Sequence, residues 1–441
     1  MKKTETRQLN QTDKQEALKI TDDLLDFIAK SPTAWQAVRV MVDRLEKIGF
    51  KPMDKAGDLK PGDLVYVTPN HSALLAFRVG SEPLEHGMKI FGAHTDSPAL
   101  RIKPNSVSES CGEIRLTTEV YGGPILNTWF DRPLSLAGRV FVKTDDPMKP
   151  EVHYVDFEEP ILILPNVAIH MNRQVNDGVK IERHKVLLPF LGNATDEADQ
   201  HKLLLKLIAD KIDVDADSIL SYDLLTYEVE KGRVCGVNKD YVSCSRLDNL
   251  AMCFAGIDAF EQTEPGKGLD VLIFTDNEEV GSGSKQGADS MAARDAIEAV
   301  LVRLGADRKT FLNLFADSYM ISADLAHAVH PNYSEYADPD HRPRINGGPA
   351  IKLAASQSYA TDGESEAIFR ALCAKADIPC QIFVNRSDLR GGSTIGPITS
   401  AWIPVRTVDI GTAVWGMHSV RETGGVNDML YMRRLLTEYF G

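Results

Sequence analysis

Paired cysteines, long hydrophobic runs and an excess of positive charge are all missing from this sequence, and each absence excludes a class of protein. The six cysteines are scattered without a C-x-x-C pair, which argues against a disulfide framework and against a structural zinc site built from cysteines. The first residues lack the apolar stretch of a secretory signal, and the apolar run 161–169 is too short to cross a bilayer. We therefore expect a cytoplasmic protein with reduced thiols and no membrane contact.

Basic residues are outnumbered by acidic ones, 49 to 63, which leaves a net charge of −14. Binding to nucleic acid requires a basic surface, so we expect no nucleic acid partner. The sequence also lacks a G-x-S-x-G elbow, an H-E-x-x-H motif and a G-x-x-x-x-G-K-[ST] phosphate loop. Its chemistry must therefore come from another arrangement of residues.

The residues that are present have the composition of a folded protein, with 43% hydrophobic and 25% charged residues. A chain of 441 residues exceeds the usual size of a single core, so we expect two domains. Alternating strand and helix patterns predict one discontinuous α/β domain, residues 1–100 and 237–441, whose sheet is covered on both faces. Short strand patterns between them predict an inserted β-rich domain, residues 101–236, with a helix near 197–211.

The stretch Val271–Ser282 is the centre of the candidate site. An apolar run there ends in two adjacent carboxylates, Glu278 and Glu279, followed by glycines, which predicts a buried strand leading into a tight turn. Two such carboxylates suit different tasks, because one can hold a metal while the other moves a proton. The ordinary alternative is a solvated turn, since charged residues are mostly exposed.

Ligand-type side chains follow predicted elements at five places that are distant in sequence. In open α/β sheets, ligands gather at the ends of strands, so these junctions can converge on one site. Each junction also has an ordinary explanation, such as a helix cap, a turn or a surface histidine. The five junctions carry His94 with Asp96, Asp248, Glu278 with Glu279, Asp324, and His418.

Two histidines and three carboxylates suit a pair of divalent metal ions. Two cations about 4 Å apart need a shared anion, so one carboxylate must bridge them. Imidazole and carboxylate together favour zinc, with manganese or cobalt tolerated. Asp96 lies two residues after His94 on the same side of the strand, where it can fix the imidazole tautomer. One of the two glutamates then remains free to act as a base.

Several motifs in order along the chain resemble the M18 family of metallo-aminopeptidases. They are GAHTDSP (92–98), SRLDN (245–249), DNEEVGS (276–282), DLAHAVHPNY (324–333), GGSTIGP (391–397) and GMHSVRE (416–422), joined within the insert by NTWFDRPLSLAGRV (127–140) and LPNVAIHMNR (164–173). The resemblance extends over nearly the whole chain and is strongest to aspartyl aminopeptidases. It implies a three-layer catalytic domain like that of other zinc peptidases, with the insert as a dimerisation domain.

The resemblance also implies two zinc ions per subunit and a role for each candidate ligand. His94 and Asp324 would hold one zinc, Glu279 and His418 would hold the other, and Asp248 would bridge them. Dimers of the chain would assemble further into a dodecamer.

The remaining roles implied by the resemblance concern catalysis and substrate. Glu278 would be the general base and Asp96 would orient a zinc ligand. His170, in the insert, would reach the active site of a neighbouring subunit.

The substrate pocket implied by the resemblance contains His327, Lys352 and Tyr359. A lysine at the base of a pocket suits an acidic side chain, because a buried carboxylate without a cation is costly. A surface lysine on a strand is the alternative. Some members of the family prefer neutral N-terminal residues.

We therefore predict a dinuclear zinc aminopeptidase that removes N-terminal Asp or Glu from peptides, using a metal-activated bridging water with Glu278 as base. One alternative is the same scaffold with a preference for neutral residues, or a deacylase of N-acylated amino acids. Another is a metal-binding assembly protein with incidental catalysis.

Overall fold

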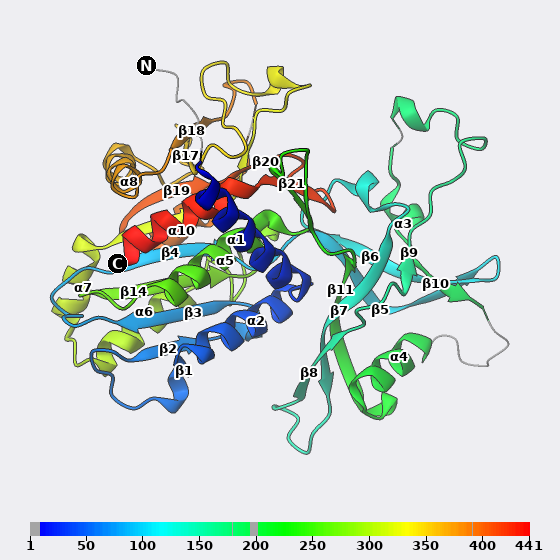
Figure 1. Ribbon diagram of the computed structural model, residues 1–441. Coiled ribbons are helices and arrows are strands. Elements are labelled where there is room, and N and C mark those ends of the chain that lie inside the picture. The colour runs from blue at the N-terminus through cyan, green and yellow to red at the C-terminus, as the bar shows by residue number, and fades with distance from the viewer. Residues whose placement is uncertain (1–8, 179, 195–201, 390) are drawn as a thin grey trace.

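The computed structural model describes residues 9–178, 180–194, 202–389 and 391–441. A nine-stranded sheet forms the centre of the larger part (Figure 1), in the order β1 (Lys51–Pro52), β2 (Leu64–Val67), β3 (Leu74–Val79), β14 (Leu269–Thr275), β4 (Lys89–His94), β15 (Tyr319–Ala323), β19 (Arg406–Gly411), β17 (Ala350–Leu353) and β18 (Gln381–Val384). The four strands β14, β4, β15 and β19 run parallel. Their carboxyl ends therefore meet along one edge.

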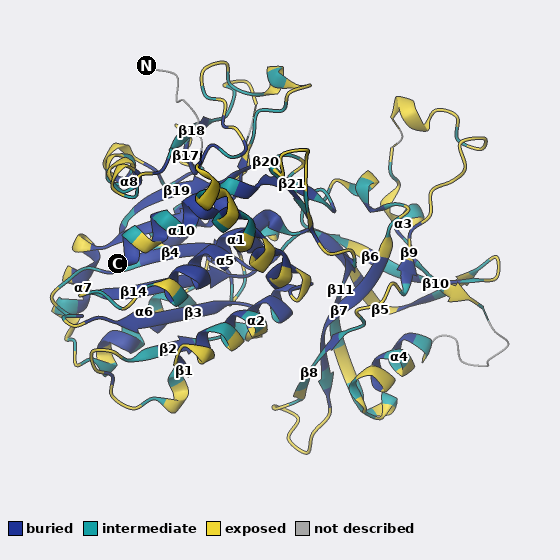
Figure 2. Cartoon of the chain, in the orientation of Figure 1, coloured by how far each residue is buried: buried dark blue, intermediate teal, exposed yellow. Residues whose placement is uncertain are grey.

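Helices cover both faces of this sheet, which gives three layers. One face packs against α1 (Gln11–Ala29), α2 (Ala34–Lys47), α5 (Leu247–Gln262), α8 (Gly363–Lys375) and α10 (Val426–Phe440). The opposite face packs against α6 (Ala292–Arg303), α7 (Arg308–Asp317) and α9 (Ile395–Trp402). Every residue of β14 is buried (Figure 2), as expected for a continuous apolar run between two helical layers.

A second, separate sheet lies beside the first (Figure 1). Its order is β11 (Ile219–Glu228), β5 (Ala99–Ser110), β6 (Glu113–Tyr121), β10 (Phe190–Asn193), β9 (Leu162–Ile163), β7 (Pro133–Val142) and β8 (Glu151–Asp156). Strand β11 also pairs with β7, so the sheet closes on itself around a hydrophobic core of its own. The helices α3 (Arg183–Val186) and α4 (Leu203–Ile212) belong to the same stretch of chain.

Two small sheets complete the described elements. Strands β12 (Arg233–Cys235), β13 (Tyr241–Cys244) and β21 (Glu422–Gly425) form one, and β16 (Ala326–His327) pairs with β20 (Ala413–Val414) in the other. No helix in the described ranges has the length and apolar character needed to cross a membrane.

The α/β prediction agrees with this structure, and the strand predicted within Val271–Ser282 is observed as β14. The predicted helix near 197–211 is observed from Leu203, and its predicted start falls among residues 195–201, outside the described ranges. The second sheet spans residues 99–228. The domain limits 1–100, 101–236 and 237–441 and the dimerisation role of the insert stay predictions.

Candidate metal centre

The predicted ligands converge on the edge of the main sheet where the parallel strands end. His94 is the last residue of β4, and Asp324 follows β15 directly. Glu278 and Glu279 begin a short 3-10 turn, Glu278–Val280, three residues after β14. Neighbouring parallel strands thus deliver these side chains to one place.

The two other ligands come from the small sheet rather than from the main one. Asp248 lies in the first turn of α5, after β13, and His418 precedes β21. Strands β13 and β21 are paired, with Cys244 opposite Glu422, and this pairing brings Asp248 and His418 together. The sequence predicted both residues at element junctions but did not indicate that a separate sheet carries them.

Asp248 lies between the two histidines and faces each with a different oxygen. Its Oδ1 is 3.5 Å from His94 Nε2, and its Oδ2 is 3.6 Å from His418 Nε2. Asp324 Oδ1 is 3.7 Å from His94 Nε2, and Glu279 Oε2 is 3.3 Å from His418 Nε2. The described residues form three groups of three potential metal ligands, and Asp248 is common to two of them, one with His94 and Asp324 and one with Glu279 and His418. The third group joins His94 to Glu278 and Glu279.

The donor set fits zinc. Asp248 Oδ1 and Glu279 Oε1 are buried, and each lacks a hydrogen-bond partner among the described residues. An acceptor oxygen buried without a donor is costly, and a bound cation would satisfy it. Two imidazole nitrogens and several carboxylate oxygens are the ligand types that zinc takes in proteins.

The electrostatics of the cluster favour a cation for the same reason. Burial, together with the charges of Asp324 and Glu279, raises the pKa of Glu278 to about 8. Burial and the charge of Asp248 raise the pKa of Glu279 to about 7, although His418 opposes this shift. Burial lowers the pKa of His418, but Asp248 and Glu279 outweigh it and raise that pKa to about 11. Burial makes the ionised carboxylates costly, and either a proton or a metal ion can offset that cost. A cation bound among these oxygens would therefore stabilise their ionised form.

Asp96 accepts several hydrogen bonds from the residues that surround the candidate ligands. Its carboxylate accepts from the backbone N–H groups of Glu278 and Glu279, each at 3.1 Å, and from the Tyr121 hydroxyl at 2.7 Å. His94 Nδ1 lies 3.3 Å from Asp96 Oδ1 and 3.1 Å from the Asp96 carbonyl. Both neighbours only accept, so His94 carries its proton on Nδ1 and directs Nε2 at the candidate metal position.

Besides Tyr121, two further contributors were not singled out from the sequence. Glu422 is buried and accepts from the backbone N–H groups of Asp248 at 2.9 Å and His418 at 2.8 Å, which fixes the two ligands to one another. Gly123 accepts from His418 Nδ1 at 3.1 Å. Glu422 ends the GMHSVRE motif, so the motif carried a signal for it, whereas Gly123 was indistinguishable from any turn glycine.

The predicted substrate residues line the same cavity as the ligands. This cavity measures about 490 Å³ and includes His327, Lys352 and Tyr359. Lys352 is buried, its Nζ lies 3.4 Å from Asp324 Oδ2 and 5.5 Å from the centre of the Tyr359 ring, and His327 is exposed. His170 is absent from this cavity and lies exposed between β9 and α3.

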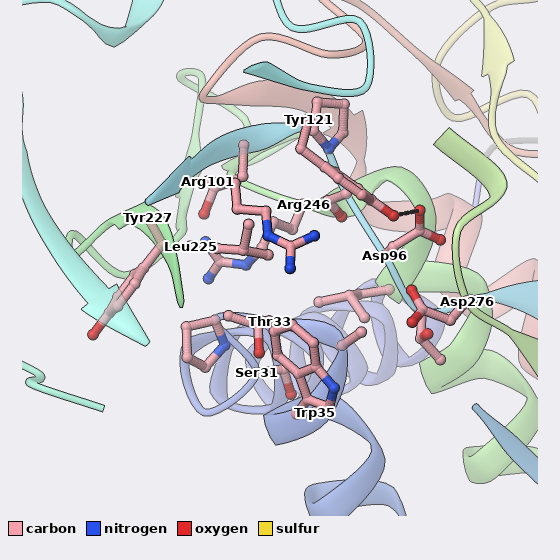
Figure 3. A pocket seen from close by; sticks show the side chains of 18 of the residues that line it. Ser31, Thr33, Trp35, Asp96, Arg101, Tyr121, Leu225, Tyr227, Arg246 and Asp276 are labelled. Atoms are coloured by element: carbon pink, nitrogen blue, oxygen red, sulfur yellow. Dashed lines mark hydrogen bonds between the residues drawn. The ribbon is translucent and has the colours of Figure 1, made fainter. Parts of the chain in front are cut away.

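A second cavity of about 410 Å³ lies between the main sheet and the insert, and Asp96 and Tyr121 are in its wall. Figure 3 shows the Tyr121 side chain extended toward Asp96, with their hydrogen bond drawn. The metal ligands are thus supported from the side of the insert as well as from the main sheet.

Comparison with known proteins identifies the family. The family model described as "Aminopeptidase I zinc metalloprotease (M18)" matches residues 27–440. The chain belongs to the M18 family. It is a zinc-dependent metallo-aminopeptidase by that membership, as the resemblance implied.

Individual relatives agree with the M18 assignment over their full lengths. A probable M18 family aminopeptidase 2 of Clostridium novyi (strain NT) is 48% identical over 96% of this chain and 99% of its own. A relative with the same name from Ectopseudomonas mendocina (strain ymp) is 42% identical over 95% of this chain and 97% of its own.

Solved structures confirm the predicted α/β fold. A chain of the structure described as the "Ape4 and Nbr1 complex" superposes with a TM-score of 0.92 and 34% identity, over 98% of this chain and 87% of that one. The structure described as "S. cerevesiae mApe1 dodecamer" superposes with a TM-score of 0.81 and 26% identity, over 96% of each chain.

Proposed function

We propose that this M18 enzyme is a dinuclear zinc aminopeptidase that releases N-terminal Asp or Glu from peptides. The position of Asp248 carries the dinuclear proposal. Its two oxygens face two histidines that belong to different groups of ligands, at nearly equal distances of 3.5 and 3.6 Å. A carboxylate that served one ion alone would not need a histidine at each oxygen.

The protein side chains divide the remaining tasks. Zinc in the two groups that share Asp248 would act as a Lewis acid and lower the pKa of water. Glu278 lines the cavity beside the ligands and is offered as the base, taking a proton and later passing it to the leaving amine. Asp96 holds His94 in the tautomer whose Nε2 is free to coordinate.

Lys352 supports the preference for acidic residues. Its ammonium is buried in the cavity wall and forms an ion pair with Asp324 Oδ2 at 3.4 Å. An ammonium has three N–H donors, so one ion pair leaves donor capacity for a carboxylate of the substrate.

The test is a comparison of kcat/KM on Asp-, Glu- and Leu-anilides for the zinc-loaded enzyme and for Lys352→Met. We expect the variant to lose about 10- to 100-fold on the acidic substrates and little on Leu, because one charge-assisted hydrogen bond contributes about 1.5–3 kcal/mol. Lys89→Met is the matched control, because Lys89 lies at the end of β4 opposite to His94 and so away from the cavity.

Equal losses on all three anilides would contradict the pocket and would mean that Lys352 serves mainly to hold Asp324. A wild-type preference for Leu would favour the neutral aminopeptidase. Hydrolysis of N-acylated amino acids alone would favour the deacylase, and bound zinc without hydrolysis would favour the assembly protein.

We further propose that the chain assembles with copies of itself through the insert. Five large apolar side chains from the last residue of β9 to the residues before α3 are exposed, an unusual density for a surface left in water. They are Ile163, Val167, Ile169, Met171 and Val175. His170 lies among them, which supports the proposal that it acts in a neighbouring subunit, and the dodecamer of the yeast relative supports the same kind of assembly.

A further inference from the structure

The end of strand β6 reaches from the insert into the metal centre. Of the three consecutive residues Tyr121, Gly122 and Gly123, the first and the last form hydrogen bonds with residues of the candidate metal centre. The Tyr121 hydroxyl donates to Asp96 Oδ2 at 2.7 Å, and the Gly123 carbonyl accepts from His418 Nδ1 at 3.1 Å. Gly122 lies between them, close to Glu279.

These contacts act on Nδ1 of His94 and of His418, the ring nitrogen that faces away from the other candidate ligands. His418 Nδ1 must carry a proton because a carbonyl can only accept, so Nε2 is left for coordination. His94 Nδ1 is oriented by Asp96, and Tyr121 is one of the donors that hold Asp96. One short segment of the insert thus supports a histidine in each group of ligands.

Tyr121 also ties Asp96 to the turn that carries the glutamates. Its hydroxyl accepts from Asn277 Nδ2 at 2.8 Å while donating to Asp96. Asn277 has a left-handed backbone, φ 63°, and its Oδ1 accepts from Ser284 and Gln286. The phenol therefore joins two elements of the main part, and a phenyl ring of the same shape could do neither task.

Gly122 is restricted by its surroundings. Its φ of +71° is unfavourable for other residues, and an added Cβ would lie 3.2 Å from the Cβ of Glu279 and 3.4 Å from Pro98. The backbone of the insert therefore approaches the ligand turn closely, and a side chain at Gly122 would require Glu279 to shift by a few tenths of an ångström.

We propose that Tyr121 is a positioning residue for the metal centre, and that the insert, through residues 121–123, sets the zinc affinity of the catalytic part. The proposal rests on the proposed zinc site and assigns the insert a role in each subunit besides assembly. Tyr121 contacts no substrate in this scheme and acts through Asp96 and Asn277.

The test measures zinc affinity by competition with a chromophoric chelator, using the full chain stripped of metal. Tyr121→Phe removes the hydroxyl alone, and we expect zinc to bind about 10- to 100-fold more weakly, the usual effect of losing a partner behind a metal ligand. Tyr227→Phe is the matched control, because its hydroxyl donates to Asp156 at 2.5 Å within the insert and contacts no ligand.

The unfolding midpoint of the metal-free proteins separates positioning from simple destabilisation. We expect Tyr121→Phe and Tyr227→Phe to lower it by similar amounts, while zinc affinity falls in Tyr121→Phe alone. A second variant, Gly122→Ala, should also weaken zinc binding because it displaces Glu279.

Zinc affinity within twofold of wild type in Tyr121→Phe would overturn the proposal, as would an equal loss of affinity in Tyr227→Phe. Both readouts are independent of peptide hydrolysis. A wild-type protein that binds zinc but cleaves no anilide would contradict the proposed function and leave this inference intact.

Discussion

At the scale of single residues, neighbouring acids in the metal centre have different surroundings and suit different tasks. Glu279 is nearly inaccessible, and its Oε2 faces His418 at 3.3 Å. Glu278 belongs to the same turn and lines the same cavity, but its backbone N–H donates to Asp96 Oδ1, whereas that of Glu279 donates to Asp96 Oδ2. In the proposed division of tasks, the same turn supplies Glu279 as a metal ligand and Glu278 as the base.

Glu278→Gln tests this division. Gln keeps the size of the side chain but cannot accept a proton, so we expect kcat on Asp-anilide to fall by about 10²- to 10⁴-fold. Zinc content, measured by atomic absorption on the same preparation, should stay at the wild-type level. Full turnover in the variant would exclude Glu278 as the base, and loss of zinc would make it a ligand instead.

The sequence predicted which ligand types would meet but not what supports them. His94, Asp324 and the two glutamates could be found because each follows a recognisable strand. Tyr121 and Gly123 could not, because a tyrosine at a strand end and a glycine in a turn are ordinary features of any β module. Their contribution depends on where the closed sheet lies against the main one, and no local pattern encodes that contact.

At the scale of elements, helix α5 links the ligand cluster to the core. Its first turn carries Asp248, and every residue from Leu247 to Phe260 is buried. The helix approaches the sheet closely at Gly256, where an added Cβ would lie 2.7 Å from the ring of Phe274 and 2.9 Å from that of Phe91. Both rings are fully buried and have little room to move.

Gly256→Ala should therefore destabilise the protein even though alanine favours helices. Overpacking costs about 1–3 kcal/mol, against a gain in helix propensity of about 1 kcal/mol. We expect a lower urea midpoint with an unchanged m-value. Gly363→Ala, in α8 with open space around it, is the control and should be neutral or slightly stabilising. A Gly256→Ala protein as stable as wild type would mean that α5 can shift away from the sheet.

The predictability of the elements follows the strength of their patterns. Strand β14 was evident as an uninterrupted apolar run. The helices α7 and α9, with 10 and 8 residues, were missed because two or three turns leave little periodicity to detect. Closure of the second sheet depends on β11 pairing with both β5 and β7, a long-range choice that the sequence does not display.

At the scale of the whole molecule, the exposed apolar side chains from Ile163 to Val175 are the feature least suited to an isolated chain, because they face water. Met171→Asp tests it, because a charge on a side chain that is 82% exposed is harmless in water and costly in an apolar interface. We expect Met171→Asp to have a smaller mass than the wild-type assembly, measured by light scattering after size exclusion. Met148→Asp, 86% exposed in the turn between β7 and β8, is the control and should leave the mass unchanged. An unchanged mass for Met171→Asp would place the contacts elsewhere.

The distribution of the metal ligands along the chain has a consequence for the lifetime of the protein. Positions 94, 248, 279, 324 and 418 approach one another only when the main sheet and the small sheet have both formed. The unfolded chain therefore offers no comparable zinc site, and zinc would bind the native state selectively. Each tenfold excess of free zinc over its dissociation constant would then add about 1.4 kcal/mol to the free energy of unfolding. Under metal starvation the same molecules would unfold more often and be degraded sooner, so the zinc supply would control the abundance of the enzyme as well as its activity.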